Sequence, residues 1–94
     1  MVHMTFGKKL KELREQKGIA QRQVGAIIEV DGAFISKVEN GDKRINRKHL
    51  IKLSQLFDIS LKELETLWLA DKVYEIVKDE RSADLVIKEV EKRI

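Results

Sequence analysis

The sequence predicts an all-α protein, and three observations carry this prediction. Apolar residues recur three or four residues apart along most of the chain, which is the spacing of one helix face. Residues that favour helix N-caps stand before most of these apolar runs. No segment alternates apolar and polar residues in the manner of a strand. The chain has 94 residues and contains neither Pro nor Cys. We therefore expect about one domain, without disulfides or thiolate metal sites.

The first helix is expected from Thr5 to Lys17. Thr5 is a favourable N-cap, and Gly18 follows a basic last turn as a typical C-cap. Ile19 is then placed to pack back onto the helix. The apolar face of this helix consists of Phe6, Leu10 and Leu13.

Two short helices with a tight turn between them are expected next. The first spans residues 21–28 and the second spans residues 31–39, with Asp31 as the cap of the second. The second helix ends at the Asn-Gly pair of residues 40–41. Two short helices joined by a turn of about three to four residues form a helix-turn-helix unit.

Three further helices complete the expected set. The fourth is expected over residues 46–57. Ser60 and Glu63 form a capping box that opens a fifth helix, which continues to about Lys78. The apolar residues of the fifth helix cover more than one face, which is too wide a stripe for a helix lying on one surface. Ser82 is expected to cap a sixth helix.

A set of residues running from the first helix to the start of the fifth carries a family resemblance. These residues are Leu13-Arg14, Gly18-Ile19-Ala20-Gln21, Val24, Val30, Ile35-Ser36-Lys37-Val38-Glu39-Asn40-Gly41, Leu50, Phe57-Asp58-Ile59-Ser60-Leu61 and Glu63-Leu64. With them the chain resembles the phage-repressor-like helix-turn-helix family, also called Cro/repressor or XRE. The resemblance implies a five-helix DNA-binding domain over residues 5–64, followed by a helical extension over residues 65–94.

Three positions depart from the usual pattern of that family. Ala20 stands where Ser or Thr usually caps the second helix, a loss of about 1 kcal/mol. Glu29 stands at a turn position often held by Gly, so it must accept a positive φ or shift the turn. Gly25 replaces the usual Ala, which keeps room for close helix contact but weakens the helix by about 1 kcal/mol.

The resemblance implies that the second helix of the unit lies in the major groove, with its N-terminal residues at the base edges. The residues expected to face the bases are Gly32, Ala33, Ser36 and Lys37, with Phe34 near their edge. Gly32 and Ala33 offer no side-chain hydrogen bond, so discrimination is expected to depend partly on DNA shape. Phe34 fits a core position equally well.

A second set of residues is expected to contact the DNA backbone. These residues are Gln21, Asn40, Lys43, Arg44 and Arg47. Lys43 and Arg44 are also compatible with ordinary solvated charges, and Asn40 with a C-cap. The resemblance further implies an ion pair between Arg14 and Glu39 that links the first helix to the end of the third.

Charge is distributed unevenly along the chain, whose net charge is +3. Residues 1–64 hold 13 basic and 8 acidic side chains, whereas residues 65–94 hold 6 basic and 8 acidic side chains. A basic first part favours contact with a polyanion such as DNA. No nucleophile with plausible catalytic neighbours, phosphate-binding Gly loop or metal cluster is present, so an enzyme, a cofactor and a metal are not expected.

The extension over residues 65–94 carries more large apolar residues than one small core can take. Exposed together, they would form a larger patch than monomers usually tolerate. We expect an isologous dimer centred on Trp68, which would set the two recognition helices about 34 Å apart, one turn of B-DNA. The expected interface residues are Leu67, Trp68, Val73, Tyr74, Val77, Val86, Ile87 and Val90. The alternative is a sixth helix that folds back over the patch within one monomer.

These observations together predict a cytoplasmic, homodimeric regulator of transcription, most simply a repressor or autoregulator, that binds a palindromic operator in double-stranded DNA. Neither a membrane nor a small-molecule partner is predicted. Two alternatives stay open. The chain could be an antitoxin or adaptor whose C-terminal helices bind another protein, or a DNA-binding subunit that recruits an enzyme.

Overall fold

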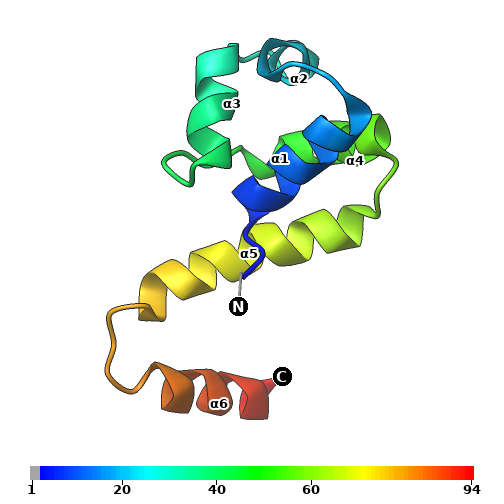
Figure 1. Cartoon of the computed structure of the whole chain (residues 1–94). Helices are drawn as coiled ribbons and strands as arrows, with labels where there is room; N and C mark the ends of the chain where they lie inside the picture. The colour runs from blue at the N-terminus through cyan, green and yellow to red at the C-terminus, as the bar shows by residue number, and fades with distance from the viewer. Residues whose placement is uncertain (1–2) are drawn as a thin grey trace.

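Helices make up nearly all of the regular structure in the computed structural model, which describes residues 3–94 (Figure 1). In chain order they are α1 (Phe6–Lys17), α2 (Gln21–Ile27), α3 (Gly32–Glu39), the short 3-10 turn η1 (Arg47–His49), α4 (Leu50–Phe57), α5 (Leu61–Val77) and α6 (Ala83–Arg93). The prediction of an all-α chain is confirmed. Within residues 3–94, no helix combines the length and the apolarity needed to cross a membrane.

Helix starts follow the predicted N-caps in four cases and depart from them in one. Side-chain oxygens of Thr5, Asp31, Asn46 and Ser60 each accept a backbone N–H from the following turn. The prediction that Ser82 caps the sixth helix is wrong, because its side chain makes no capping hydrogen bond. Its φ of −105° and ψ of 33° lie outside the extended region that N-cap residues usually adopt.

Two predicted turn features are also confirmed. Gly18 ends α1 with a φ of 71°, and the Ile19 N–H donates to the Arg14 carbonyl at 3.3 Å, as in a Schellman cap. Glu29 adopts a φ of 62°, so the turn keeps its position and the non-glycine residue accepts the left-handed conformation. Such a conformation costs a non-glycine residue about 1–2 kcal/mol.

One core lies between α1, α2, α3, α4 and the first half of α5. Its buried members are Phe6, Leu10, Val24, Ile28, Ile35, Val38, Ile45, Leu50, Leu53, Leu64 and Trp68. Leu13, Ile19, Phe34 and Leu67 are partly buried and pack against this cluster. The core therefore extends one turn of α5 beyond Leu64, the expected end of the DNA-binding domain.

Trp68, the predicted centre of the dimer interface, is largely buried within its own chain. The residue is only 9% exposed within its own protomer, and its indole Nε1–H donates to the Ile45 carbonyl at 2.8 Å. The reason is the path of α5, which crosses beneath α1 and α4 and brings this side chain to the core (Figure 1). Val77 is likewise buried at 8% exposure, so it too is not a free interface residue.

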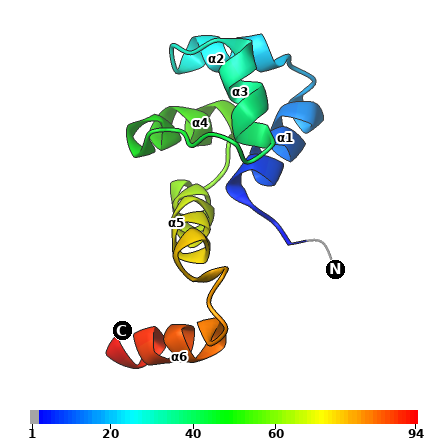
Figure 2. The ribbon, with the colours of Figure 1, turned by 90° about the vertical axis from the view of Figure 1, so that its left-hand side faces the viewer.

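The C-terminal part of the chain projects away from this core. α6 lies below α5 in both views (Figures 1 and 2), and none of its residues is buried. The exposed apolar residues of α5 and α6 are Leu69, Val73, Tyr74, Ile76, Leu85, Val86, Val90 and Ile94. α6 thus does not fold back to cover these apolar residues within the monomer, which was the alternative to a dimer.

Candidate nucleic-acid interface

The helix-turn-helix unit consists of α2, the turn of residues 28–31 and α3. α2 and α3 pack against each other along the upper part of the molecule (Figure 2). Gly25 permits this packing, because a Cβ atom at that position would overlap the Val30 carbonyl oxygen. Asp31 then starts α3, since its Oδ1 accepts the Phe34 N–H at 2.7 Å. The unit therefore depends on a glycine where the family usually has Ala.

A second glycine, which the sequence did not single out, sets the distance between α1 and α3. A Cβ atom at Gly7 would overlap the Val38 carbonyl oxygen and come within 2.9 Å of the Glu39 carbonyl oxygen. α1 therefore meets the C-terminal end of α3 through main-chain atoms. Sequence reasoning missed this residue because a glycine in a helix is visible only as a weak helix former.

A buried ionic network fixes the end of α3 against α1 and α2. Arg14 donates from Nε and Nη2 to the two carboxylate oxygens of Glu39, at 2.7 and 3.1 Å. Gln21 Nε2 donates to Glu39 Oε1 at 3.0 Å, and Arg14 Nη1 donates to the Ile19 carbonyl at 3.1 Å. The hydrogen bonds that Arg14 donates to Glu39 raise the pKa of Arg14 above its already high ordinary value. The ion pair expected from the resemblance is present.

Gln21, which was predicted to contact a phosphate, also has a structural role within the protein. Its amide N–H group is directed to Glu39. The missing cap at Ala20 is partly replaced by Gln23, whose Oε1 accepts the Ala20 N–H at 2.6 Å. The start of α2 is thus held by two glutamine side chains in different ways.

The residues predicted to face the bases are distributed along α3 and differ in exposure. Ala33 and Lys37 are exposed, whereas Gly32 and Ser36 are half-buried. Phe34 is half-buried and packs against the core, which favours the second of its two predicted positions. The outward surface of α3 is therefore formed chiefly by Ala33, Ser36 and Lys37.

Arg22 is an exposed residue beside this surface that sequence reasoning missed. Its backbone nitrogen lies 3.1 Å from the position that a Cβ atom at Gly32 would occupy. Arg22 therefore stands next to the N-terminal end of α3. The sequence did signal it as a basic residue in the first turn of α2. It was overlooked because that helix was interpreted only by its apolar residues.

The loop after α3 brings part of the predicted backbone set close to Lys37. Asp42 and Lys43 donate their backbone N–H groups to the Lys37 carbonyl, at 2.8 and 3.3 Å. Asn40 and Lys43 are both exposed on this loop. These two residues therefore lie at the C-terminal end of α3, next to its outward surface.

Arg44 and Arg47, the other two predicted backbone contacts, have partners in α5. Arg44 Nη2 donates to the Trp68 carbonyl at 2.9 Å, and its guanidinium carbon lies 4.4 Å from the centroid of the indole ring. Arg47 Nη2 lies 3.2 Å from Glu65 Oε2. These two arginines are exposed, as Lys43 is, but their side chains also contact α5.

The fold agrees with comparisons against known proteins. A helix-turn-helix family model matches residues 10–64, which is more than half of the chain. The chain belongs to that helix-turn-helix family.

Two of its relatives are controller proteins and one is a phage repressor. Control protein C.MunI from a Mycoplasma species is 36% identical over 64 residues, which are 67% of this chain and 86% of the relative. The crystal structure of the restriction-modification controller protein C.AhdI from Aeromonas hydrophila has a TM-score of 0.55 and 32% identity, covering 63% of this chain and 86% of the other. The P22 c2 repressor in complex with synthetic operator 9T has a TM-score of 0.60 at 24% identity, covering 66% and 94%. The similarity to the P22 c2 repressor structure supports the repressor-like fold.

Proposed function

We propose that this chain is a sequence-specific, DNA-binding regulator of transcription that acts as a homodimer on a palindromic operator. The observation that carries the proposal is the outward surface of α3, where Ala33 and Lys37 are exposed while the rest of the helix is fixed to α1 and α2. A helix held in this way can enter the major groove as a rigid reader. Lys37 can donate to guanine O6 or N7, and Ala33 can contact a thymine methyl group.

The backbone contacts of the proposed complex come from both ends of α3. Arg22 stands at its N-terminal end, and Asn40 and Lys43 stand at its C-terminal end. Because these groups flank the reading surface, they suit phosphates on the two sides of one groove. The names of the two controller relatives favour regulation of a restriction-modification system as the biological setting.

Selection of bound fragments from a random DNA pool tests the proposal directly. We expect one enriched palindrome with half-sites about one helical turn apart. Binding to it should weaken with salt with a log–log slope of about −4, because each of the two protomers contributes two charged phosphate contacts, Arg22 and Lys43. Absence of enrichment, together with a flat salt response, would refute DNA binding by this chain.

We place the dimer contact on the exposed apolar residues of α5 and α6. The chain exposes 6909 Å², whereas a compact monomer of 10.9 kDa exposes about 5,600 Å². The excess exceeds the roughly 800 Å² per partner that a standard interface buries. An isolated helix as short as α6 is also marginal in water. Both facts support a second copy packed on this arm.

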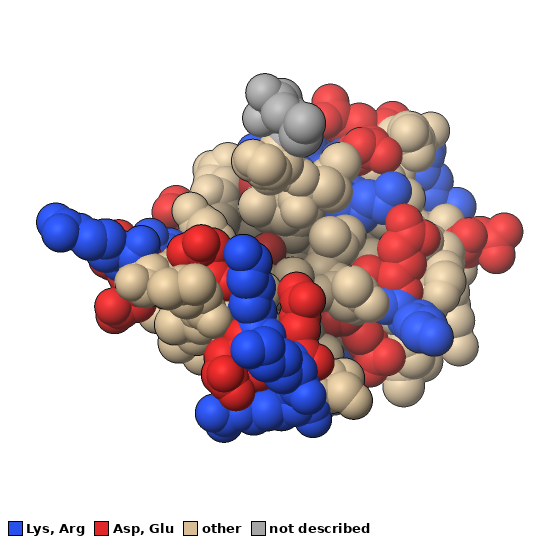
Figure 3. Space-filling view, turned by 90° about the horizontal axis from the view of Figure 1, so that it is seen from below, with Lys and Arg blue, Asp and Glu red and all other residues tan. Residues whose placement is uncertain are grey.

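The charges on this side of the molecule fit a protein partner better than DNA. Seen from below, acidic and basic side chains are interspersed around uncharged surface (Figure 3). Such a mixed surface lacks the single-sign field that attracts a polyanion. The DNA-reading surface and the proposed dimer surface thus lie on different parts of the chain.

Sedimentation of single-residue variants tests the dimer contact without shortening the chain. Val73→Asp and Val90→Asp each place a charge on the exposed apolar residues, and both should convert a dimer into a monomer at micromolar concentration. Glu91→Ala, on an exposed part of α6, is the matched control and should leave the dimer intact. A monomeric wild-type chain would contradict the homodimer and favour an adaptor whose α6 binds a different protein.

A further inference from the structure

Trp68 joins α5 to the loop that follows α3 through two hydrogen bonds, one that it donates and one that it accepts. The indole Nε1–H donates to the Ile45 carbonyl at 2.8 Å, while Arg44 Nη2 donates to the Trp68 carbonyl at 2.9 Å. The guanidinium carbon of Arg44 lies 4.4 Å from the ring centroid, within the range of cation–π attraction. Two adjacent loop residues are therefore attached to one residue of α5.

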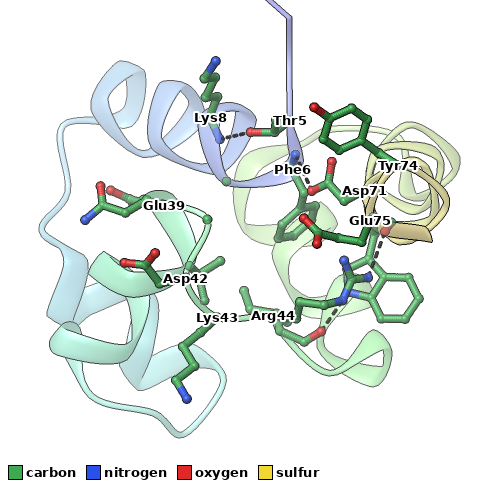
Figure 4. A pocket seen from close by; sticks show the side chains of 16 residues that line it. Thr5, Phe6, Lys8, Glu39, Asp42, Lys43, Arg44, Asp71, Tyr74 and Glu75 are labelled. Atoms are coloured by element: carbon green, nitrogen blue, oxygen red, sulfur yellow. Dashed lines mark hydrogen bonds between the residues drawn. The ribbon is translucent and has the colours of Figure 1, made fainter. Parts of the chain in front are cut away.

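These contacts cross one side of an open cleft of about 510 Å³. The cleft lies between the start of α1, the loop after α3 and the middle of α5 (Figure 4). A second bridge crosses it where the Phe6 N–H donates to Asp71 Oδ2 at 3.1 Å. Because the cleft is not filled by side chains, the loop depends on a few specific contacts with α5 for its position.

The same loop carries the groups that we assign to phosphate contacts, namely Asn40 and Lys43. α5 in turn leads to the arm that we assign to the dimer. The Arg44–Trp68 contact therefore lies between the two parts of the proposed function. A shift of the loop away from α5 would move Lys43 relative to the second protomer as well as to the DNA.

We propose that Arg44 and Trp68 are positioning residues for DNA binding, and that Arg44 is not itself a phosphate ligand. This inference rests on the proposed function. The hydrogen bond from Nη2 and the contact with the indole ring hold the Arg44 guanidinium against α5. The competing possibility is a phosphate-binding cluster, because Lys72 and Arg47 also approach the ring centroid, at 4.9 and 5.7 Å.

The salt dependence of operator binding separates the two roles of Arg44. A residue that neutralises a phosphate changes the log–log slope by about 0.9 per protomer, whereas a positioning residue changes affinity at an unchanged slope. We expect Arg44→Gln to weaken binding about three- to tenfold, the equivalent of one hydrogen bond, without a change of slope. Arg44→Lys should not restore affinity, because an ammonium lacks the planar guanidinium that spans ring and carbonyl. Lys43→Ala is the control that should reduce the slope.

Trp68→Phe provides an uncharged test of the second contact between the loop and α5, the indole hydrogen bond to the Ile45 carbonyl. It removes the indole N–H and keeps an aromatic ring, so we expect weaker operator binding at an unchanged slope. The double variant with Arg44→Gln should bind about as weakly as the weaker single variant, because contacting residues are not additive. If Trp68→Phe fails to fold by circular dichroism, the Arg44 variants decide the question alone.

Three results would overturn the inference. The first is a reduced slope for Arg44→Gln that Arg44→Lys restores, which would make Arg44 a phosphate ligand. The second is wild-type affinity in Arg44→Gln. The third is absence of operator binding by the wild-type chain, which would refute the proposed function itself. This result is distinguishable from the other two because it is seen without any substitution.

Discussion

Replacing Glu39 by Gln should destabilise the protein far more than replacing any exposed carboxylate. The Glu39 side chain is 2% exposed and accepts three hydrogen bonds, two from Arg14 and one from Gln21. Gln offers one oxygen to these three donors and turns an NH₂ group towards them. Arg14, whose side chain is 14% exposed, would then lack a counter-charge. Removal of one partner from such a pair costs about 3–5 kcal/mol, and we expect the lower end because Gln keeps the volume.

Urea unfolding followed by circular dichroism measures this loss of free energy. All variants are compared at one protein concentration, because the stability of a dimer depends on concentration. Glu12→Gln is the matched control, since the Glu12 side chain is 42% exposed and lies at a long 3.5 Å from Lys9 Nζ. We expect it to change stability by less than about 1 kcal/mol. A loss below about 1 kcal/mol for Glu39→Gln as well would refute the argument from burial.

The pH dependence of this stability follows from the raised pKa of Arg14. A group whose pKa is raised on folding contributes stability that is complete below its unfolded pKa and is lost as the pH rises through its folded pKa. Both pKa values are strongly alkaline for an arginine, and the hydrogen bonds donated to Glu39 raise the folded one further. The difference between wild type and Glu39→Gln should therefore stay constant from neutral pH to about pH 9.

Three further substitutions test other parts of the structure. Glu29→Gly should stabilise the chain by about 1 kcal/mol in the same urea assay, because it relieves a positive φ, and a loss of stability would show that the Glu29 side chain itself contributes. Gly25→Ala should destabilise it by about 1–3 kcal/mol through overlap with the Val30 carbonyl, whereas an unchanged value would mean that the turn can shift. Lys37→Ala should cost about 1–3 kcal/mol of operator binding and relax preference at one base pair per half-site, and equal weakening on every sequence would assign Lys37 to the backbone.

Local features of the fold could be predicted because their causes lie within a few residues. The N-caps at Thr5 and Asp31, the C-cap at Gly18 and the positive φ at Glu29 all depend on the chemistry of one turn. The outward residues of α3 could be assigned as candidates through the family resemblance. A family resemblance supplied the Arg14 pair, which spacing alone does not indicate.

Features that depend on the path of α5 could not be predicted. The wide apolar stripe on this helix requires two partners, but periodicity does not say which residue meets which partner. Trp68 was therefore assigned to the dimer although it completes the core. Arg44 was assigned to DNA because the aromatic ring beside it is distant in the sequence. The close approach at Gly7 likewise depends on the crossing of two helices.

Main-chain contacts at both ends of α3 have a consequence for how this protein can diversify. At one end Gly7 meets the carbonyl groups of residues 38–39, and at the other Gly32 faces the backbone of Arg22. The position of α3 against the rest of the protein thus does not depend on the shape of its outward side chains. Ala33 and Lys37 can be exchanged without repacking the interior, so we expect new operator preferences to evolve, or to be engineered, at almost no expense in stability.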